Sequence, residues 1–236
     1  MWNNQVTGGY ARESAAALEN AREILAVLNS LGWQRGAIAG YLGNVQFETE
    51  LNPWRWQSDE VLSSDDPRIA TSTTNAYGMV QFTPAGKYCQ DSRARAIPGF
   101  GPNYSNRAGS EYDGYAQLVY VDRYADYIPR APYDSITYAM YKSMTSDPEL
   151  CADIWLVNYE RGTPSALRRE NALYWFEILA DYEPGQPDLP PGVLPIPRGA
   201  LAMIARQKGG GAHENILKRR LAGHSQNSSN RQGKRY

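Results

Sequence analysis

One carboxylate, Glu48, interrupts an otherwise apolar helical stripe, and this is the first sign of chemistry in the sequence. Segment 34–50 has helical periodicity, and at about 100° per residue Glu48 lies within about 20° of Tyr41. Glu50 points about 200° away and is expected to face solvent. A carboxyl on a core-facing stripe is either paired with an arginine or used in a reaction. Burial and the negative end of a helix both help a carboxyl to keep its proton, as general acid catalysis requires.

Other catalytic chemistries lack their residues in positions 1–197. His213 and His224 are the only histidines. A Ser-His-Asp or Cys-His hydrolase and a zinc enzyme are therefore not expected, and neither a metal nor a cofactor is expected. Cys89 and Cys151 could form one disulfide or remain two thiols. Chemistry must rest on carboxylates, tyrosines and amides.

Helical periodicity elsewhere predicts a mainly α fold. A first helix begins after the N-cap Ser14 and ends at Gly32, and Pro53 cannot continue the second. Further helices are predicted over 112–127, 134–143, 148–160 and 164–182. Residues 54–110 are rich in Ser, Thr, Pro, Gly and Asn, which indicates loops and one short β-hairpin around 71–82. The predicted class is α+β, mainly α, with a small hairpin and loop insertion.

Charge divides the chain unevenly. Residues 1–197 carry 15 Lys and Arg against 24 Asp and Glu, whereas residues 198–236 carry 9 against one. The prolines after position 183 favour an extended, semi-rigid linker. We therefore expect a folded domain over 1–183, a Pro-rich linker over 184–197 and a flexible basic tail over 198–236.

The termini and the composition limit the partners. The N-terminal residues lack the charged and apolar regions of a secretory signal, and no apolar run approaches the roughly 20 residues of a membrane span. The chain has 17 Tyr and 6 Trp against 4 Phe, which fits an aromatic-lined carbohydrate groove or, equally, a Tyr-decorated surface. No aromatic side chains interleave the basic clusters of the tail, so nucleic acid is not the expected partner.

Three segments resemble the phage tail lysozymes. Residues 43–53, GNVQFETELNP, are similar to the Gly-Asn-Met-x-x-Glu-Ser-x-x-Asn-Pro helix end that carries the catalytic glutamate of that family; goose-type lysozymes and lytic transglycosylases show a similar Glu-Ser. Residues 75–84, NAYGMVQFTP, resemble a Gly-x-x-Gln-Trp-Thr-Pro segment that lines the cleft. Residues 155–162, WLVNYERG, with Arg168 and Ala172 after them, resemble a Tyr-Glu-Arg-Pro helix and an arginine-rich helix. Thr49, Phe82 and Gly162 depart from the pattern, where Ser, Trp and Pro are usual.

The resemblance implies a lysozyme-like catalytic domain in which Glu48 protonates the glycosidic oxygen between N-acetylmuramic acid and N-acetylglucosamine. A second group must support the transition state. Asp59, Glu60, Asp65 and Asp66 could activate a water or could be solvated loop charges. The related transglycosylases use one Glu and leave an anhydro sugar, so hydrolysis and transglycosylation both stay open.

The resemblance also suggests which residues bind the glycan. The expected substrate-binding residues are Trp56, Tyr77, Gly78, Gln81, Phe82 and Tyr159. Gln81 and Tyr77 would hydrogen-bond sugars, and Gly78 would permit close approach of the glycan. Trp54 and Trp56 either stack on sugar faces or close the core. Glu160 with Arg161 is interpreted as a structural ion pair at a helix end.

The implied protein is carried on the tail of a phage particle and acts on the host cell wall, with no signal peptide of its own. Its partners would be peptidoglycan glycan strands and other virion proteins, the latter through the tail over 198–236. The alternative is a virion structural protein that keeps the fold and binds glycan without cleaving it. Glu48 in its expected context favours the enzyme.

Overall fold

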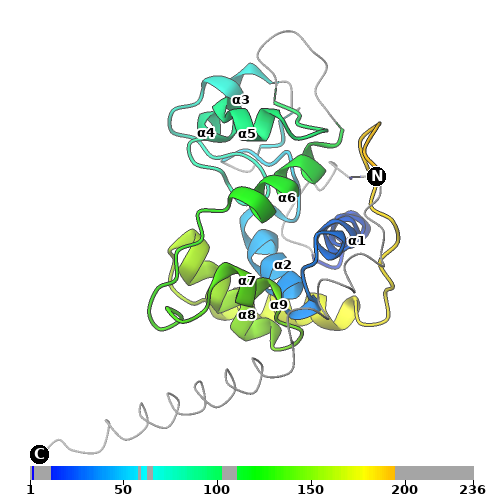
Figure 1. Cartoon of the computed structure of the whole chain (residues 1–236), viewed down its shortest axis with the longest axis vertical. Helices are drawn as coiled ribbons and strands as arrows, with labels where there is room; N and C mark the ends of the chain where they lie inside the picture. Colours follow the sequence, from blue (N-terminus) through cyan, green and yellow to red (C-terminus); the bar gives the residue numbers. More distant parts are fainter. Residues whose placement is uncertain (1, 3–11, 58–59, 63–65, 103–110, 195–236) are drawn as a thin grey trace, which may run out of the picture. The chain divides into compact units, whose positions relative to one another are not determined.

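The computed structural model describes residues 2, 12–57, 60–62, 66–102 and 111–194. They belong to one unit, 1–195, whereas the second unit, 196–236, lies outside the described residues, so the predicted basic tail stays a prediction. The elements in chain order are α1 (Ala15–Ser30), α2 (Arg35–Thr49), α3 (Pro67–Thr71), α4 (Ala85–Gln90), α5 (Ser92–Arg95), α6 (Asp113–Tyr124), α7 (Tyr138–Lys142), α8 (Pro148–Trp155), the π-helical turn η1 (Leu156–Glu160) and α9 (Ala166–Ile178) (Figure 1).

The mainly α class is confirmed. Helices α1, α2, α6, α7, α8 and α9 fall where hydrophobic periodicity predicts them. Ser14 caps α1 as expected, since its hydroxyl accepts a hydrogen bond from the Ala17 amide at 3.1 Å. The sequence did not predict α3, α4 and α5, which are four to six residues long and lie in the segment whose Ser, Thr, Pro, Gly and Asn content indicated loops.

The predicted hairpin is not confirmed as a pair of strands. The described residues contain three isolated antiparallel bridges, which join Arg55 to Val61, Trp56 to Tyr77 and Tyr77 to Phe82. The last of these closes a tight turn, in which the Phe82 amide donates to the Tyr77 carbonyl at 2.8 Å. In its described residues, the loop-rich insertion therefore consists of short helices and turns rather than a small sheet.

Helix α2 is the centre of the fold and contacts α1, α7, α8 and α9 (Figure 1). All of its residues are buried except Arg35, Phe47 and Glu48. Because α2 is covered on nearly every side, its surroundings change only at its two ends. The C-terminal end is the place where a side chain can leave the core.

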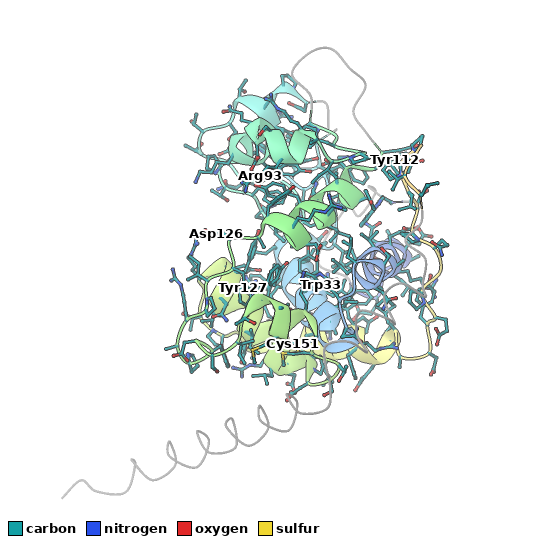
Figure 2. All side chains as sticks on the ribbon, viewed as in Figure 1. Trp33, Arg93, Tyr112, Asp126, Tyr127 and Cys151 are labelled. Carbon is teal, nitrogen blue, oxygen red and sulfur yellow. The ribbon has the colours of Figure 1, made fainter. Side chains whose placement is uncertain are left out.

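An aromatic cluster fills the space between α2 and the later helices. Trp33 is fully buried, and its ring makes edge contacts with Tyr41 and Tyr141, with ring centroids 5.9 and 5.8 Å apart. Trp33 lies inside this group of helices, as does Cys151 on α8 (Figure 2). Cys89 and Cys151 do not pair with each other; both are separate buried thiols. The core therefore relies on aromatic packing without a disulfide.

The first part of the predicted linker is described and lies against the body. Residues 184–194 form no helix, and Pro187 and Pro190 are buried. The Asp188 amide donates to the Glu23 carboxylate of α1 at 3.2 Å. This stretch therefore contacts α1, and its extended, semi-rigid character stays a prediction. None of the described helices is both long and apolar enough to cross a membrane.

Candidate active site

Glu48 lies on the last turn of α2. Its side chain is 28% exposed, although Tyr41, seven residues earlier on the same face, is fully buried. The two residues share a helix face but not an environment: Phe47 and Glu48 are partly exposed, although Thr49 and Leu51 after them are buried. Glu48 is therefore a half-exposed carboxyl above a buried helix.

The expectation that Glu50 faces solvent is wrong. Glu50 is 1% exposed, and its carboxylate lies 3.7 Å from the Arg55 guanidinium. The reason is local: Glu50 and Leu51 both adopt the left-handed conformation, with φ of 55° and 61°. The helix ends there, so 100° per residue no longer describes where these side chains point.

Arg168 on α9 connects three acceptors at the end of α2. Its Nη2 pairs with the Glu48 carboxylate, and its Nη1 donates to Glu160 Oε2 at 2.6 Å and to Asn44 Oδ1 at 2.9 Å. The half-exposed Phe47 ring lies against the same guanidinium, with its centroid 4.4 Å away. The sequence had left open whether Glu48 pairs with an arginine, and Arg168 is that partner.

Glu160 is the inner carboxylate of this network. Besides Arg168, its Oε1 accepts a hydrogen bond from the Trp155 indole at 3.1 Å. Burial raises the pKa of Glu160 to about 7, against the opposing effect of Arg168. The predicted pair with Arg161 is wrong: Arg161 adopts a left-handed conformation that ends η1, and it pairs with Asp126 instead.

Close helix packing makes the network possible. A Cβ added to Gly43 of α2 would lie 2.5 Å from the Arg168 carbonyl oxygen and 2.7 Å from the Ala172 Cβ. A glycine at this position lets α9 approach α2 closely enough for the Arg168 side chain to reach Glu48 and Asn44. Asn44 also donates to the Ala152 carbonyl at 3.1 Å, which ties α8 to the same turn of α2.

The segment 75–84 is joined to the end of α2. The Thr49 hydroxyl lies 3.1 Å from the Val45 carbonyl and 3.3 Å from the Met79 carbonyl. The hydroxyl that Thr49 shares with the usual Ser is thus used in this contact. Gln81 is half-exposed with a φ of 49°, and its Nε2 donates to the Gly78 carbonyl at 3.1 Å.

Tyr77 and Gly78 lie below this surface rather than on it. Tyr77 is fully buried, and its hydroxyl donates to Asp113 Oδ2 at 2.8 Å. Gly78 has a φ of +84°, and an added Cβ would lie 2.5 Å from the Gln117 Oε1. The close approach that Gly78 permits is therefore that of Gln117, and Tyr77 presents no ring to a glycan.

The other predicted binding residues are divided between core and surface. Trp56 and Trp54 are each 6% exposed, so they close the core. Phe82 is half-buried and stacks on Tyr88 with centroids 4.4 Å apart. Tyr159 is half-exposed and stacks on Trp155 with centroids 4.3 Å apart. Gln81, Phe82 and Tyr159 thus remain partly accessible.

Two of the four loop carboxylates are described, and both interact with Arg68. Glu60 and Asp66 lie 2.9 and 2.8 Å from the Arg68 guanidinium, and Asp66 also caps α3. Asp59 and Asp65 lie outside the described residues. Over the same described part, no group of three or more His, Cys, Asp and Glu side chains could hold a metal ion.

Sequence reasoning missed the residues that support the site from within. Asp113 and Gln117 on α6 face the segment 75–84, and Gln117 accepts from the Met79 amide at 2.8 Å and donates to the Pro53 carbonyl at 2.8 Å. Both are fully buried polar residues. Their spacing of four residues puts them on one helix face, which was the available signal.

Comparison with known proteins identifies the family of this chain. Residues 19–179 match the phage tail lysozyme family, a range that includes Glu48, the segment 75–84, Glu160 and Arg168. The chain is 32% identical over 168 residues to Morphogenesis protein 1 of Bacillus phage B103. This match covers 68% of the present chain. The match spans 39% of that relative's length. This chain belongs to the phage tail lysozyme family.

Proposed function

We propose that this chain is a virion-associated peptidoglycan glycosidase of a bacteriophage, with Glu48 as its general acid. Membership of the phage tail lysozyme family supports the reaction class. The observation that carries the assignment of Glu48 is its position, 28% exposed at the end of a buried helix and next to more buried charged partners. Such a carboxyl can reach a bound glycan while its orientation is fixed from within.

In the proposed reaction Glu48 donates its proton to the glycosidic oxygen as the bond from the anomeric carbon to that oxygen breaks. The anomeric carbon takes on oxocarbenium character and is then attacked by water or by a hydroxyl of the same sugar. Glu48 becomes a carboxylate at that moment. Arg168, which already hydrogen-bonds this carboxyl, would stabilise the charge that develops there.

The glycan contacts are proposed for the accessible side chains only. Gln81 would hydrogen-bond sugars, and Phe82 and Tyr159 would offer ring faces. Tyr77, Gly78 and Trp56 would act indirectly, since they are buried and set the shape of the segment that carries Gln81. Of the predicted binding residues, the accessible ones would therefore contact the glycan directly, and the buried ones would support them.

We further propose that the protein acts from the phage particle. The relative is a morphogenesis protein of a Bacillus phage, which supports association with other virion proteins. Delivery on the particle would bring the enzyme to the host wall when the genome is injected. The basic residues over 198–236 are the proposed contact with the virion.

The test is digestion of purified sacculi, first from Bacillus and then from a Gram-negative species, by the full chain and by its Glu48→Gln variant. Mass spectrometry of the soluble products should show disaccharide-containing muropeptides for the wild type and none for the variant. Reducing ends would indicate hydrolysis, and 1,6-anhydro ends would indicate transglycosylation. If the folded wild type releases nothing from either wall, the glycosidase assignment fails.

A second candidate, a virion protein that binds glycan without cleaving it, has one observation in its favour. The Glu48 carboxylate is held in an ion pair with Arg168, which is also how a purely structural glutamate would be placed. Co-sedimentation with sacculi without release of fragments would identify this function.

A further inference from the structure

Phe47, the residue before Glu48, is the most exposed aromatic side chain among the described residues. It is 39% exposed, whereas Gln46 and Thr49, on either side of this pair, are buried. A single exposed apolar residue is common on protein surfaces, so the place of this ring matters more than its exposure. That place is the last turn of α2, beside the proposed catalytic carboxyl.

The Phe47 ring is held in place from one side. One face lies against the Arg168 guanidinium, whose carbon is 4.4 Å from the ring centroid. Arg168 is itself fixed by its ion pair with Glu48. It also donates to Glu160 at 2.6 Å and to Asn44 at 2.9 Å. The ring is thus ordered before a ligand binds, and a contact with it costs little side-chain entropy.

A contact of the same kind lies at the other end of α2 and offers a comparison. Arg35 is the first residue of α2, and its guanidinium carbon is 5.9 Å from the centroid of the Phe176 ring on α9. Phe176 is half-buried. Helices α2 and α9 thus form an arginine–phenylalanine contact at each end, and the more exposed ring is the one beside Glu48. Contact with an arginine therefore does not by itself leave a ring exposed in this fold.

We infer that Phe47 is a substrate-binding residue whose ring packs against the C–H face of a sugar next to the bond that Glu48 protonates. The inference rests on the proposed function of Glu48. The ring and the Glu48 carboxylate contact the same guanidinium, so a sugar whose glycosidic oxygen reaches Glu48 also lies close to the ring. A pyranose has hydroxyls at its edge and C–H groups on its faces, and these C–H groups match the negative face of an aromatic ring.

The part of peptidoglycan that meets Phe47 should be the glycan and not the stem peptide. A general acid has to reach the glycosidic oxygen, so the two sugars joined by that oxygen are the parts of the substrate nearest to Glu48. Phe47 is the neighbouring residue on the same turn of α2. A ring that packs on the sugar before and during the reaction strengthens binding without selective stabilisation of the transition state.

The test observes the phenylalanine rings directly. The chain has four phenylalanines, so ¹³C-labelled rings give few signals, and the variants Phe47→Leu and Phe176→Leu assign two of them. The probe is a soluble glycan strand from which an amidase has removed the stem peptides. The protein is the full chain with Glu48→Gln, chosen to suppress cleavage during the titration. The Phe47 signals should shift and show nuclear Overhauser contacts with sugar protons, whereas the Phe176 signals should stay in place.

Affinity for the strand gives a second readout. In the same background, Phe47→Ala should weaken binding about tenfold, and Phe47→Tyr, which keeps the ring, should bind like its parent. Phe176→Ala removes the corresponding contact at the other end of α2, so it is the matched control and should keep an affinity within about twofold of the parent. With Glu48 restored, Phe47→Ala should raise the KM for strands about tenfold and change kcat less than about threefold.

Three results would overturn the inference. The first is a set of Phe47 signals that ignore the peptide-free strand, and the second is a shift seen only with strands that keep their stem peptides. The third is a loss of kcat with an unchanged KM, which would mean that the ring serves to hold Arg168. If Phe47→Ala does not fold, the ring signals decide alone. A Phe47 contact with the strand in a protein whose wild type cleaves no wall would refute the glycosidase proposal and leave the glycan contact standing.

Discussion

Two acidic sites in this protein, one fully buried at Asp113 and one partly exposed at Glu48, are built in different ways. Asp113 accepts hydrogen bonds from four neutral donors: Tyr77, Tyr88, the Gly101 amide and Gln117, at 2.7 to 3.2 Å. Glu48 and Glu160 instead share one arginine. Asp113 is fully buried and its pKa is raised to about 6, chiefly by desolvation.

The difference separates a supporting carboxyl from a reactive one. All four donors around Asp113 come from different parts of the fold, so this side chain joins α4, α6 and the loops on either side of them. In the Glu48 cluster the Glu48 side chain is 28% exposed, whereas those of Arg168 and Glu160 are 9% and 14% exposed. Asp113 therefore contributes mainly to stability, and Glu48 mainly to the proposed reaction.

The largest effect is expected for the activity of the Glu48→Gln variant, which tests whether Glu48 acts in the reaction. Glu48→Gln should lower the release of muropeptides by about 10²- to 10⁴-fold, since a general acid contributes about that much. The thermal unfolding temperature should change little, because the amide still accepts a hydrogen bond from Arg168. Glu170→Gln is the matched control and should digest sacculi at the wild-type rate. A Glu48→Gln protein with wild-type activity would remove Glu48 from the mechanism.

Substitution of Asp113 should reduce the stability of the fold rather than the activity of the folded protein. Asp113→Ala leaves four buried donors without their acceptor, which should reduce the free energy of unfolding by about 3–4 kcal/mol. Urea denaturation measures this free energy of unfolding, and Asp181→Ala, a change at an exposed position, is the control. Activity per folded molecule should stay within a few-fold of wild type. A stable but inactive Asp113→Ala protein would contradict the comparison.

The raised pKa of Asp113 should make the folded protein less stable as the pH rises through 6. Its pKa is raised from 3.8 to about 6 in the folded state, so its stabilising contribution is complete below about pH 4 and is lost as the pH rises through 6. The expected loss is about 3 kcal/mol between these limits. Asp113→Asn cannot titrate and should flatten this part of the curve of unfolding free energy against pH. The fall in unfolding free energy that continues up to pH 7 in both proteins should come from Glu160, whose pKa is also raised. Equal slopes for both proteins would exclude Asp113 as the source.

A smaller effect is expected where helix packing supports the Glu48 cluster. Gly43→Ala places a methyl group 2.5 Å from the Arg168 carbonyl and should cost about 1–3 kcal/mol of unfolding free energy. The displaced α9 should also lower the rate of muropeptide release. Gly185→Ala, where an added Cβ meets nothing within 4 Å, is the control and should be neutral. Wild-type activity in Gly43→Ala would show that the position of Arg168 is not critical.

The smallest effect concerns the link between α2 and the segment 75–84. Thr49→Val removes the hydroxyl near the Met79 carbonyl and should cost about 1 kcal/mol, whereas Thr49→Ser should be close to wild type. Thermal melts of the three proteins give the comparison. Similar melting temperatures for Val and Ser would mean that packing, and not the hydrogen bond, makes this contact.

Local patterns were enough to predict the main helices and the place of Glu48. The caps and the apolar spacing located α1 and α2, because both depend on residues within a few positions of each other. The order of the three segments was enough to predict the family. The same reasoning failed at Glu50, where a left-handed residue ends the helix and turns the side chain inward.

Tertiary structure alone decided how the charges pair. Arg168 lies 120 residues after Glu48, and Glu160 bonds to Arg168 rather than to its neighbour Arg161. The burial of Tyr77 depends on α6, which follows it by 36 residues. Periodicity describes the direction of a side chain relative to its own helix, whereas its partner and its exposure depend on which other elements pack there.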